Sequence, residues 1–132
     1  MSYRWVEHVG ELELHVEAGD EAAVLADTVA ALHELLADDD RDGELEWRHV
    51  QAHGRDRAGL LAAWIEELTF LAETEGFVAE RIGELALDRV RVRARVGGRH
   101  GSPPHLVKAV TYHRLSFEPG GRGWRATAVL DV

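Results

Sequence analysis

The sequence predicts an α+β domain in which a mainly antiparallel sheet carries two helices on one face. Two segments place apolar residues at helical spacing behind an aspartate, while several others alternate apolar and polar residues as strands do. The second half of the chain is almost entirely hairpin-like. The 132 residues are expected to form a single domain, residues 1–132, because domains commonly have about 100–150 residues.

The first strand is predicted at residues 11–18, where apolar and polar residues alternate strictly. Residues 4–7 are expected to begin the same strand, with Gly10 as a bend or bulge. Asp20 can then cap a helix over residues 21–36. The apolar stripe of that helix consists of Leu25, Val29, Leu32 and Leu36.

The second helix is the best-marked element of the sequence. A strand is predicted before it at residues 44–53, and Asp56 can cap the helix over residues 57–75. Gly76 is a natural C-terminal cap because glycine tolerates the left-handed backbone conformation. The buried stripe consists of Leu61, Trp64, Ile65, Leu68 and Leu71.

The remainder of the chain is predicted to be rich in strands. These strands are expected at residues 77–87, 89–96, 107–118 and 124–132. Residues 97–105, with two prolines, are expected to form a loop, and residues 119–123 a hairpin turn. A kink is expected near His113.

Composition restricts the function classes. The chain has no cysteine, no apolar run near the ~18 residues that a membrane span needs, and no apolar core of a signal peptide at its start. We therefore expect a cytoplasmic protein that does not enter a membrane. The net charge of −9 argues against tight binding of nucleic acid by the average field. A role in RNA biology would then depend on a local basic patch or on a protein partner, with RNA contacted only indirectly.

The motifs of common enzymes are missing. The eight histidines include no His-Glu-x-x-His pattern, and the three serines include none on a nucleophile elbow. There is also no phosphate-cradling glycine loop. A metal-dependent hydrolase is therefore disfavoured, and we expect a protein that is not an enzyme.

Three stretches in the same order along the chain resemble the archease family. They are Tyr3-Arg4-Trp5-Val6-Glu7-His8-Val9-Gly10-Glu11-Leu12, the helix segment Trp64-Ile65-Glu66-Glu67-Leu68 with its Thr74-Glu75-Gly76 exit, and Val107-Lys108-Ala109-Val110-Thr111-Tyr112-His113 before a Leu130-Asp131-Val132 ending. The resemblance implies a strand–helix–strand-strand domain with an inserted segment. It also implies a non-catalytic activator of the GTP-dependent ligase that joins tRNA halves, promoting guanylylation of the ligase. The alternative that the family suggests is a chaperone or modulator of a tRNA methyltransferase.

The family further implies a divalent metal, taken to be calcium. Carried over to this chain, its ligands are Glu11, Asp131 and the carboxylate of Val132, with Glu11 standing where the family has aspartate. Calcium or another hard cation accepts such oxygen donors. Judged from the residues alone, Glu11 and Asp131 can equally be ordinary exposed strand carboxylates.

A second acidic stretch partly matches a calcium-binding loop. Asp38-x-Asp40-x-Asp42-Gly43 has the spacing of the first half of such a loop. The closing glutamate is absent, because His49 occupies its position, and a strand follows instead of a helix. We therefore interpret this stretch as a solvated acidic turn.

The resemblance also makes three other side chains candidates for partner contact or activation, namely Lys108, His113 and His8. Lys108 is the only lysine among fifteen basic residues. The alternative for both histidines is a hydrogen-bonded structural role, which is the more common one.

A row of arginines marks one face of a predicted strand. It consists of Arg89, Arg91, Arg93 and Arg95. The row is a possible docking patch for the ligase or its RNA. The alternative is a solvated face paired with Glu11, Glu13 and Glu17 on a neighbouring strand.

Overall fold

The computed structural model describes residues 2–37, 43–101 and 107–132. Within these residues, seven strands and two helices follow one another along the chain. They are β1 (Ser2–His8), β2 (Glu11–Ala18), α1 (Glu21–Leu36), β3 (Glu46–His53), α2 (Arg57–Glu75), β4 (Phe77–Leu87), β5 (Arg91–His100), β6 (Ala109–Gly120) and β7 (Gly123–Asp131).

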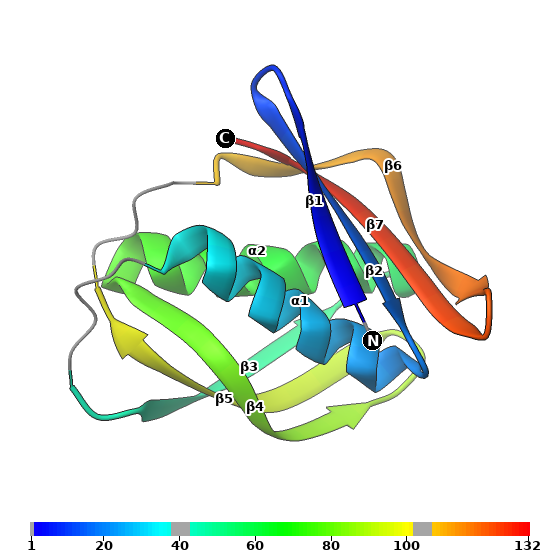
Figure 1. Cartoon of the computed structure of the whole chain (residues 1–132). Coiled ribbons are helices and arrows are strands. Elements are labelled where there is room, and N and C mark those ends of the chain that lie inside the picture. The colour runs from blue at the N-terminus through cyan, green and yellow to red at the C-terminus, as the bar shows by residue number, and fades with distance from the viewer. Residues whose placement is uncertain (1, 38–42, 102–106) are drawn as a thin grey trace.

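The strands form two antiparallel sheets with the helices between them (Figure 1). The four-stranded sheet has the order β1-β2-β7-β6, and the three-stranded sheet has the order β3-β5-β4. The predicted α+β class, with antiparallel strands and two helices, is confirmed. The strands are divided between two sheets, however, rather than joined in the single sheet expected, so the helices contact both sheets.

The helices lie in the middle layer because both are apolar on more than one side. The predicted stripe of α1 is buried, and so is that of α2 except for the half-buried Leu71. Trp64 of α2 is fully buried, and its indole N–H donates to the carbonyl of Leu25 in α1 at 3.2 Å. This bond satisfies the polar atom of the largest core side chain and joins the two helices. Neither described helix is both long enough and apolar enough to cross a membrane.

The predicted bounds of both helices are confirmed, because their end signals are local. The carboxylate of Asp20 accepts from the N–H of Ala23, and that of Asp56 from the N–H of Gly59, each at 2.8 Å. Gly76 ends α2 with φ 69°, as expected of a glycine cap.

The N-terminal strand prediction is wrong in one respect. Residues 2–8 and 11–18 are two strands of a hairpin, not one bent strand, and Ser2 pairs with Glu17 at its open end. The chain reverses at Val9 and Gly10, where Gly10 has φ 73°. Glycine permits this conformation and so makes the two-residue connection possible.

The loop predicted at residues 97–105 begins later than expected, because β5 continues to His100. A side chain at Gly98 would place Cβ 2.2 Å from the carbonyl oxygen of Val78, so only glycine allows β4 to pair this closely. The glycines that favour a loop in the sequence therefore serve close strand contact in the structure. Residues 102–106, which include both prolines of the expected loop, lie outside the described residues.

The kink expected near His113 coincides with an irregularity in β6. The pairing of β6 with β7 shifts register between Thr111 and Ser116. Within this bulge, Arg114 has φ 58°, the one positive φ among the described non-glycine residues. The bulge directs the side chain of Arg114 to Glu13 of β2, which no regular strand pairing would predict.

Candidate functional site

The residues with the implied metal role meet at one end of the four-stranded sheet. Glu11 of β2 pairs in register with Asp131 of β7, which in turn pairs with Ala109 of β6. Register partners present their side chains on the same face, with Cβ atoms about 4.5–5.5 Å apart. The two carboxylates are therefore neighbours, and both residues are half-buried. Figure 1 shows the end of β7 beside the start of β6.

Two backbone hydrogen bonds bring further residues to this end of the sheet. The N–H of Val132 donates to the carbonyl of Gly10 at 3.2 Å, and the N–H of Lys108 donates to the carbonyl of Asp131 at 2.8 Å. Residues from three separate stretches of the sequence thus converge on Asp131. We call this region the carboxylate end, defined by Glu11, Asp131, Val132 and Lys108.

The donor chemistry of the carboxylate end fits a hard cation. Glu11 and Asp131 supply carboxylate oxygens, and the carbonyls of the strand ends are oxygen donors of the kind that calcium accepts. Within the described ranges, no group of three histidine, cysteine, aspartate or glutamate side chains is placed to hold a metal ion. A cation here would therefore need backbone oxygens, the Val132 carboxylate or water to complete its coordination. The acidic turn at residues 38–42 lies outside the described residues, and the segment after it forms β3 rather than a helix.

Lys108 is exposed at the rim of a small hollow between α2 and β6. The hollow has a volume of about 150 Å³, and Glu66, Phe70 and Glu73 of α2 form its other side. Phe70 is 58% exposed, which is unusual for a phenylalanine on a packed helix. Lys108 therefore faces, across the hollow, two carboxylates and an exposed aromatic ring of α2.

The candidate histidines differ in their surroundings. His8 of β1 places Nε2 3.7 Å from the carboxylate of Glu13, so it joins a charged cluster. His113 is exposed, and its side chain has neither a hydrogen bond nor an ion pair with any described residue. His8 therefore has a nearby acidic partner, whereas His113 has none among the described residues, and the roles of both stay predictions.

The charged cluster around Glu13 is a feature that the sequence interpretation missed. Glu13 is only 7% exposed, and its carboxylate lies 3.2 Å from His15 Nε2 and 3.2 Å from Arg114 Nε. Burial acts to raise the pKa of Glu13, but hydrogen bonding to His15 and the charge of Arg114 outweigh it, and the net pKa is lowered. The alternation in β2 places Glu11, Glu13 and His15 on one face, and this was the available signal. The contact of Arg114 with Glu13 depends on the bulge in β6, which the sequence does not show.

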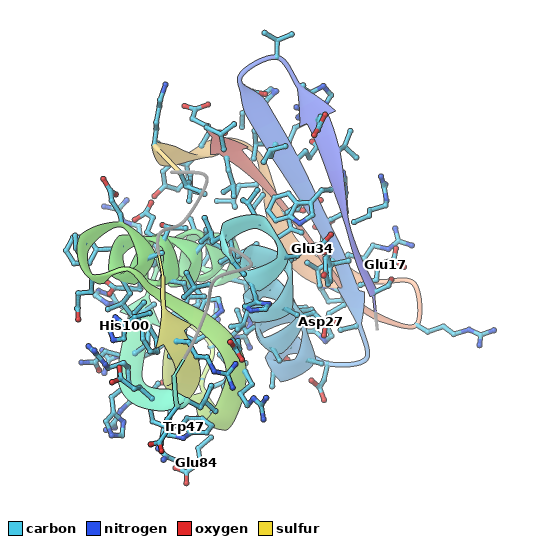
Figure 2. The ribbon with its side chains drawn as sticks, turned by 60° about the vertical axis from the view of Figure 1, so that its left-hand side comes forward. Glu17, Asp27, Glu34, Trp47, Glu84 and His100 are labelled. Atoms are coloured by element: carbon cyan, nitrogen blue, oxygen red, sulfur yellow. The ribbon has the colours of Figure 1, made fainter. Side chains whose placement is uncertain are left out.

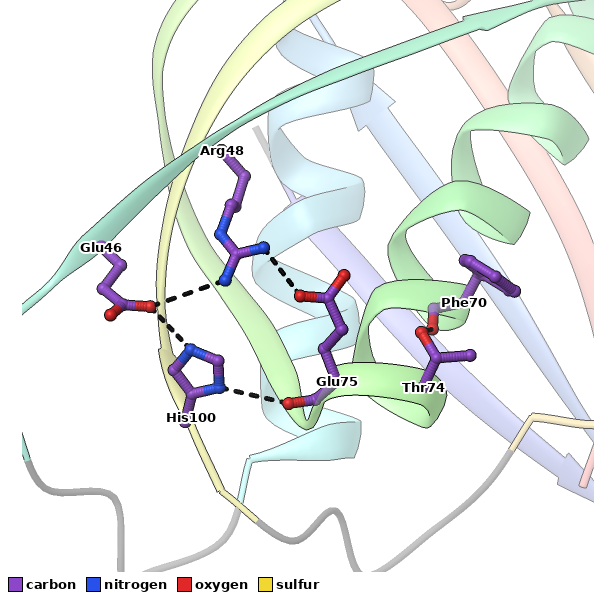
Figure 3. A network of polar contacts seen from close by, with 6 residues as sticks. All are labelled: Glu46, Arg48, Phe70, Thr74, Glu75 and His100. Carbon is purple, nitrogen blue, oxygen red and sulfur yellow. Dashed lines mark hydrogen bonds and ion pairs between the residues drawn. The ribbon is translucent and has the colours of Figure 1, made fainter.

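A second network joins the three-stranded sheet to the end of α2 (Figure 3). Arg48 of β3 forms an ion pair with Glu75 of α2 at 2.8 Å, and His100 Nε2 of β5 lies 2.6 Å from Glu46 Oε2. The other ring nitrogen of His100 lies 3.1 Å from the carbonyl oxygen of Glu75. These contacts fasten the C-terminal end of α2 to the sheet, and we assign them a structural role.

The arginine row lies on the three-stranded sheet. Arg91, Arg93 and Arg95 belong to β5, whereas Arg89 lies in the turn before it. The expected pairing with Glu11, Glu13 and Glu17 is wrong, since β2 belongs to the other sheet. On β3, the register partners of the row are instead His53, Gln51 and His49.

Comparison with known proteins places the chain in a family. The sequence matches the Archease protein family (MTH1598/TM1083) over residues 3–132. "Protein archease" of Pyrobaculum neutrophilum is 27% identical, covering 98% of this chain and 95% of its own. "Protein archease" of Methanopyrus kandleri is 29% identical, and the match covers 100% of both chains.

Solved structures agree with this fold. The solution structure of protein 1598 of Methanobacterium thermoautotrophicum superposes with a TM-score of 0.77 at 20% identity, covering 98% of each chain. The crystal structure of an archease of Thermotoga maritima, described as a possible chaperone, superposes with a TM-score of 0.69 at 16% identity. The match covers 96% of this chain and 94% of that one. At these identities the likeness concerns the fold, whereas the family match extends over almost the whole sequence. The chain belongs to the archease family.

Proposed function

We propose that this protein is a non-catalytic activator of a GTP-dependent tRNA-splicing RNA ligase in the cytoplasm, promoting guanylylation and multiple turnover of the ligase. The observation that carries the proposal is the convergence at the carboxylate end. Glu11 and Asp131 are register partners, and the backbone of Lys108 is bonded to Asp131. Lys108, whose backbone is anchored at this end of the sheet, carries an exposed ammonium that suits contact with an anionic or nucleotide-bearing partner surface.

The proposal includes calcium or another hard divalent cation at the carboxylate end. Glu11, Asp131 and the Val132 carboxylate would hold it, and the bound cation would neutralise carboxylates that otherwise repel one another. The ends of β2 and β7 would then be held together, which fixes Lys108 relative to both strands. The partner contacts are assigned to Lys108 and His113, with His8 in a supporting role through Glu13.

The activity test is multiple-turnover RNA ligation by the cognate ligase, with GTP and metal, at substoichiometric amounts of this protein. The unaltered protein should raise turnover, while Asp131→Ala and Lys108→Ala should abolish the increase. Glu17→Ala is the matched control, because Glu17 pairs with Arg125 at the other end of the same β2–β7 strand pair. Equal activation by Asp131→Ala and Glu17→Ala would refute the site assignment.

Cation binding has a test that is independent of the ligase. Titration calorimetry with calcium chloride should give binding heat for the unaltered protein and for Glu17→Ala, and none for Glu11→Ala or Asp131→Ala. Extending the chain by one alanine after Val132 should weaken binding, because the carboxylate moves away from Asp131. Unchanged binding by the extended chain would exclude the Val132 carboxylate as a ligand.

The second candidate function is that of a chaperone or modulator of a tRNA methyltransferase. It is favoured by the description of the Thermotoga maritima relative as a possible chaperone. The two functions separate in one comparison: an activator raises turnover of a correctly folded ligase, whereas a chaperone suppresses aggregation of unrelated clients. Failure to accelerate a ligase that is already active, together with suppressed aggregation of the methyltransferase, would favour the second function.

A further inference from the structure

The outer face of the three-stranded sheet is basic in a chain that is acidic overall. The helices cover the other face, on which Val50, Val92 and Val96 are buried. Among its described strand residues, the outer face carries Arg81, Arg91, Arg93 and Arg95, with Glu84 as an acidic residue. Arg99 has the same alternation in β5 and pairs with Glu80. Two histidines and a glutamine extend this face on β3, so its charge is opposite to the net charge of −9.

The central arginines of this face are not neutralised by their neighbours. Among the residues that the structure describes, neither Arg93 nor Arg95 forms an ion pair. Glu84 is the register partner of Arg95, yet it does not approach the guanidinium within ion-pair distance. Unpaired cations in a row along a strand leave a positive field to be met by an external anion.

An aromatic platform lies beside these arginines. The guanidinium of Arg95 stacks over the ring of Trp47 at 4.3 Å from the ring centre. A Cβ atom at Gly83 would lie 2.8 Å from the Trp47 ring, and one at Gly97 would lie 3.0 Å from it. The ring therefore packs directly against these two glycines. Figure 2 shows Trp47 and Glu84 projecting from the side of the sheet away from the helices.

A shallow hollow of about 420 Å³ lies next to this platform. Its polar lining consists of His49, Gln51, Arg93 and Arg95 together with the carboxylate of Glu84. An imidazole, an amide and two guanidinium groups supply donors for phosphate oxygens and for base edges. The arginines alternate along β5 and are therefore about 6.7 Å apart, twice the rise of a strand residue. This spacing is comparable to the step between phosphates of an extended nucleic-acid strand.

We propose that the outer face of the three-stranded sheet, with Arg91, Arg93 and Arg95 beside Trp47, binds single-stranded RNA. The arginines meet the phosphates, and a base stacks on the exposed side of the Arg95 guanidinium that Trp47 holds in place. RNA is thus contacted directly through a local patch, although the average field of the chain opposes it. The inference does not rest on the proposed ligase activation, because it concerns binding by this protein alone.

Single-stranded RNA fits this face better than an acidic protein does. A protein interface needs apolar anchors at its centre. The large apolar side chains that the described structure exposes are Val9, Phe70 and Tyr112, and all three lie on other elements. Planar stacking groups combined with spaced cations suit bases and phosphates instead. An acidic polypeptide would use the charges and leave the Trp47–Arg95 stack without a role.

The test is fluorescence anisotropy with a labelled single-stranded oligouridylate of about 12 nucleotides. The variant in which Arg91, Arg93 and Arg95 are all replaced by glutamine should bind about tenfold or more weakly at about 50 mM salt. The slope of log affinity against log salt should fall in magnitude by about 2, because each lost phosphate contact removes about 0.7.

The matched control replaces Arg4, Arg122 and Arg125 by glutamine. These exposed arginines belong to the four-stranded sheet and its hairpin turn, and the net charge changes by the same amount. The control should bind like the unaltered protein. An equal loss in both triple variants would overturn the proposal, because average charge alone would explain it. No binding by the unaltered protein at low salt would also overturn it.

Arg95→Lys distinguishes RNA from an acidic protein partner. Lysine keeps the charge and loses the planar stacking surface. RNA affinity should fall for this variant while affinity for poly-L-glutamate stays unchanged. Tight binding of poly-L-glutamate without binding of RNA would replace this proposal with an acidic protein partner. If the unaltered protein binds RNA but does not activate the ligase, the proposed function is refuted and this inference stands.

Discussion

Glu13 is enclosed by two histidines and Arg114, and this environment determines how its charge affects stability. Its carboxylate is almost completely buried and accepts from His15 and Arg114. A buried carboxylate is stable only when such partners replace water. Its lowered pKa shows that the partners outweigh the cost of burial. The cluster holds β1, β2 and the bulge of β6 together across the outer face of the four-stranded sheet.

Glu13→Gln should destabilise the protein at pH 7 by about 1–3 kcal/mol, because Arg114 loses its charged acceptor. The folded-state pKa of Glu13 lies below the ordinary value of 4.5. The stabilisation is therefore present above pH 4.5 and is lost as the pH falls through the lower folded-state pKa. Urea denaturation at pH 7 and at low pH measures the difference.

Glu17→Gln is the control for this prediction. Glu17 also faces outward from β2, but its side chain is 67% exposed where it meets Arg125. Its replacement should change stability by about 0.5 kcal/mol or less. Equal costs for the two variants would contradict the special role of the buried carboxylate.

Among the elements, the junction between α2 and β4 depends on one glycine. Gly76 has φ 69°, and a Cβ atom there would lie 2.6 Å from the carbonyl oxygen of Gly101. Gly76 also accepts a hydrogen bond from the N–H of Gly101 at 2.9 Å. The residue thus ends the helix and pairs with the chain beyond β5 at the same point.

Gly76→Ala should lower the free energy of unfolding by about 2 kcal/mol or more, because left-handed strain and the close contact with Gly101 act together. Gly19→Ala is the matched change, since Gly19 has no positive φ and a Cβ atom there meets nothing within 4 Å. That variant should be neutral or slightly stabilising. Thermal unfolding of both variants measures the contrast, and similar melting temperatures would contradict it.

The same elements show which parts of the fold are predictable from sequence. Both helices were located correctly because caps and apolar stripes are local signals. The β1–β2 hairpin was interpreted as one bent strand, because only Val9 and Gly10 separate the two strands and so short a turn resembles a bend. The sequence does not predict the extension of β5 through Gly97 and Gly98. These glycines make room for the Trp47 ring and for the backbone of β4, which are distant in sequence.

The candidate site likewise has residues that the sequence identifies and contacts that only the structure reveals. The family resemblance named Glu11 and Asp131, and the structure makes them register partners, although their role as ligands stays a prediction. The Glu13 cluster and the Trp47–Arg95 stack each need a contact between distant segments. A single sequence shows the residue types of such contacts and does not show which ones meet.

At the scale of the whole molecule, the two sheets share one helical layer and should unfold together. Trp64 and Leu25 belong to one core cluster that also contains buried residues of both sheets. Leu14→Ala, a change in the core side of the four-stranded sheet, should cost about 2–5 kcal/mol. Urea transitions followed by far-UV circular dichroism and by tryptophan fluorescence should shift equally. A biphasic transition would show that the sheets are independent.

The arrangement also separates the two proposed surfaces. The carboxylate end belongs to the four-stranded sheet, and the basic face lies beyond the helices on the three-stranded sheet (Figure 1). Occupation of one surface leaves the other accessible. The two proposals are therefore compatible with one molecule holding a protein partner and an RNA strand at the same time.

The central position of β7 has a consequence for synthesis on the ribosome. β7 lies between β2 and β6, yet β2 emerges near the start of this sequence and β7 near its end. The β1–β2 hairpin must therefore wait with one backbone edge of β2 unpaired, and an isolated hairpin is only marginally stable. The three-stranded sheet needs no late segment and can form first. Nascent chains stalled before β7 would then expose the unpaired edge of β2, and such an edge is a template for pairing with other chains, which makes this interval the one in which a chaperone of the cell would be needed.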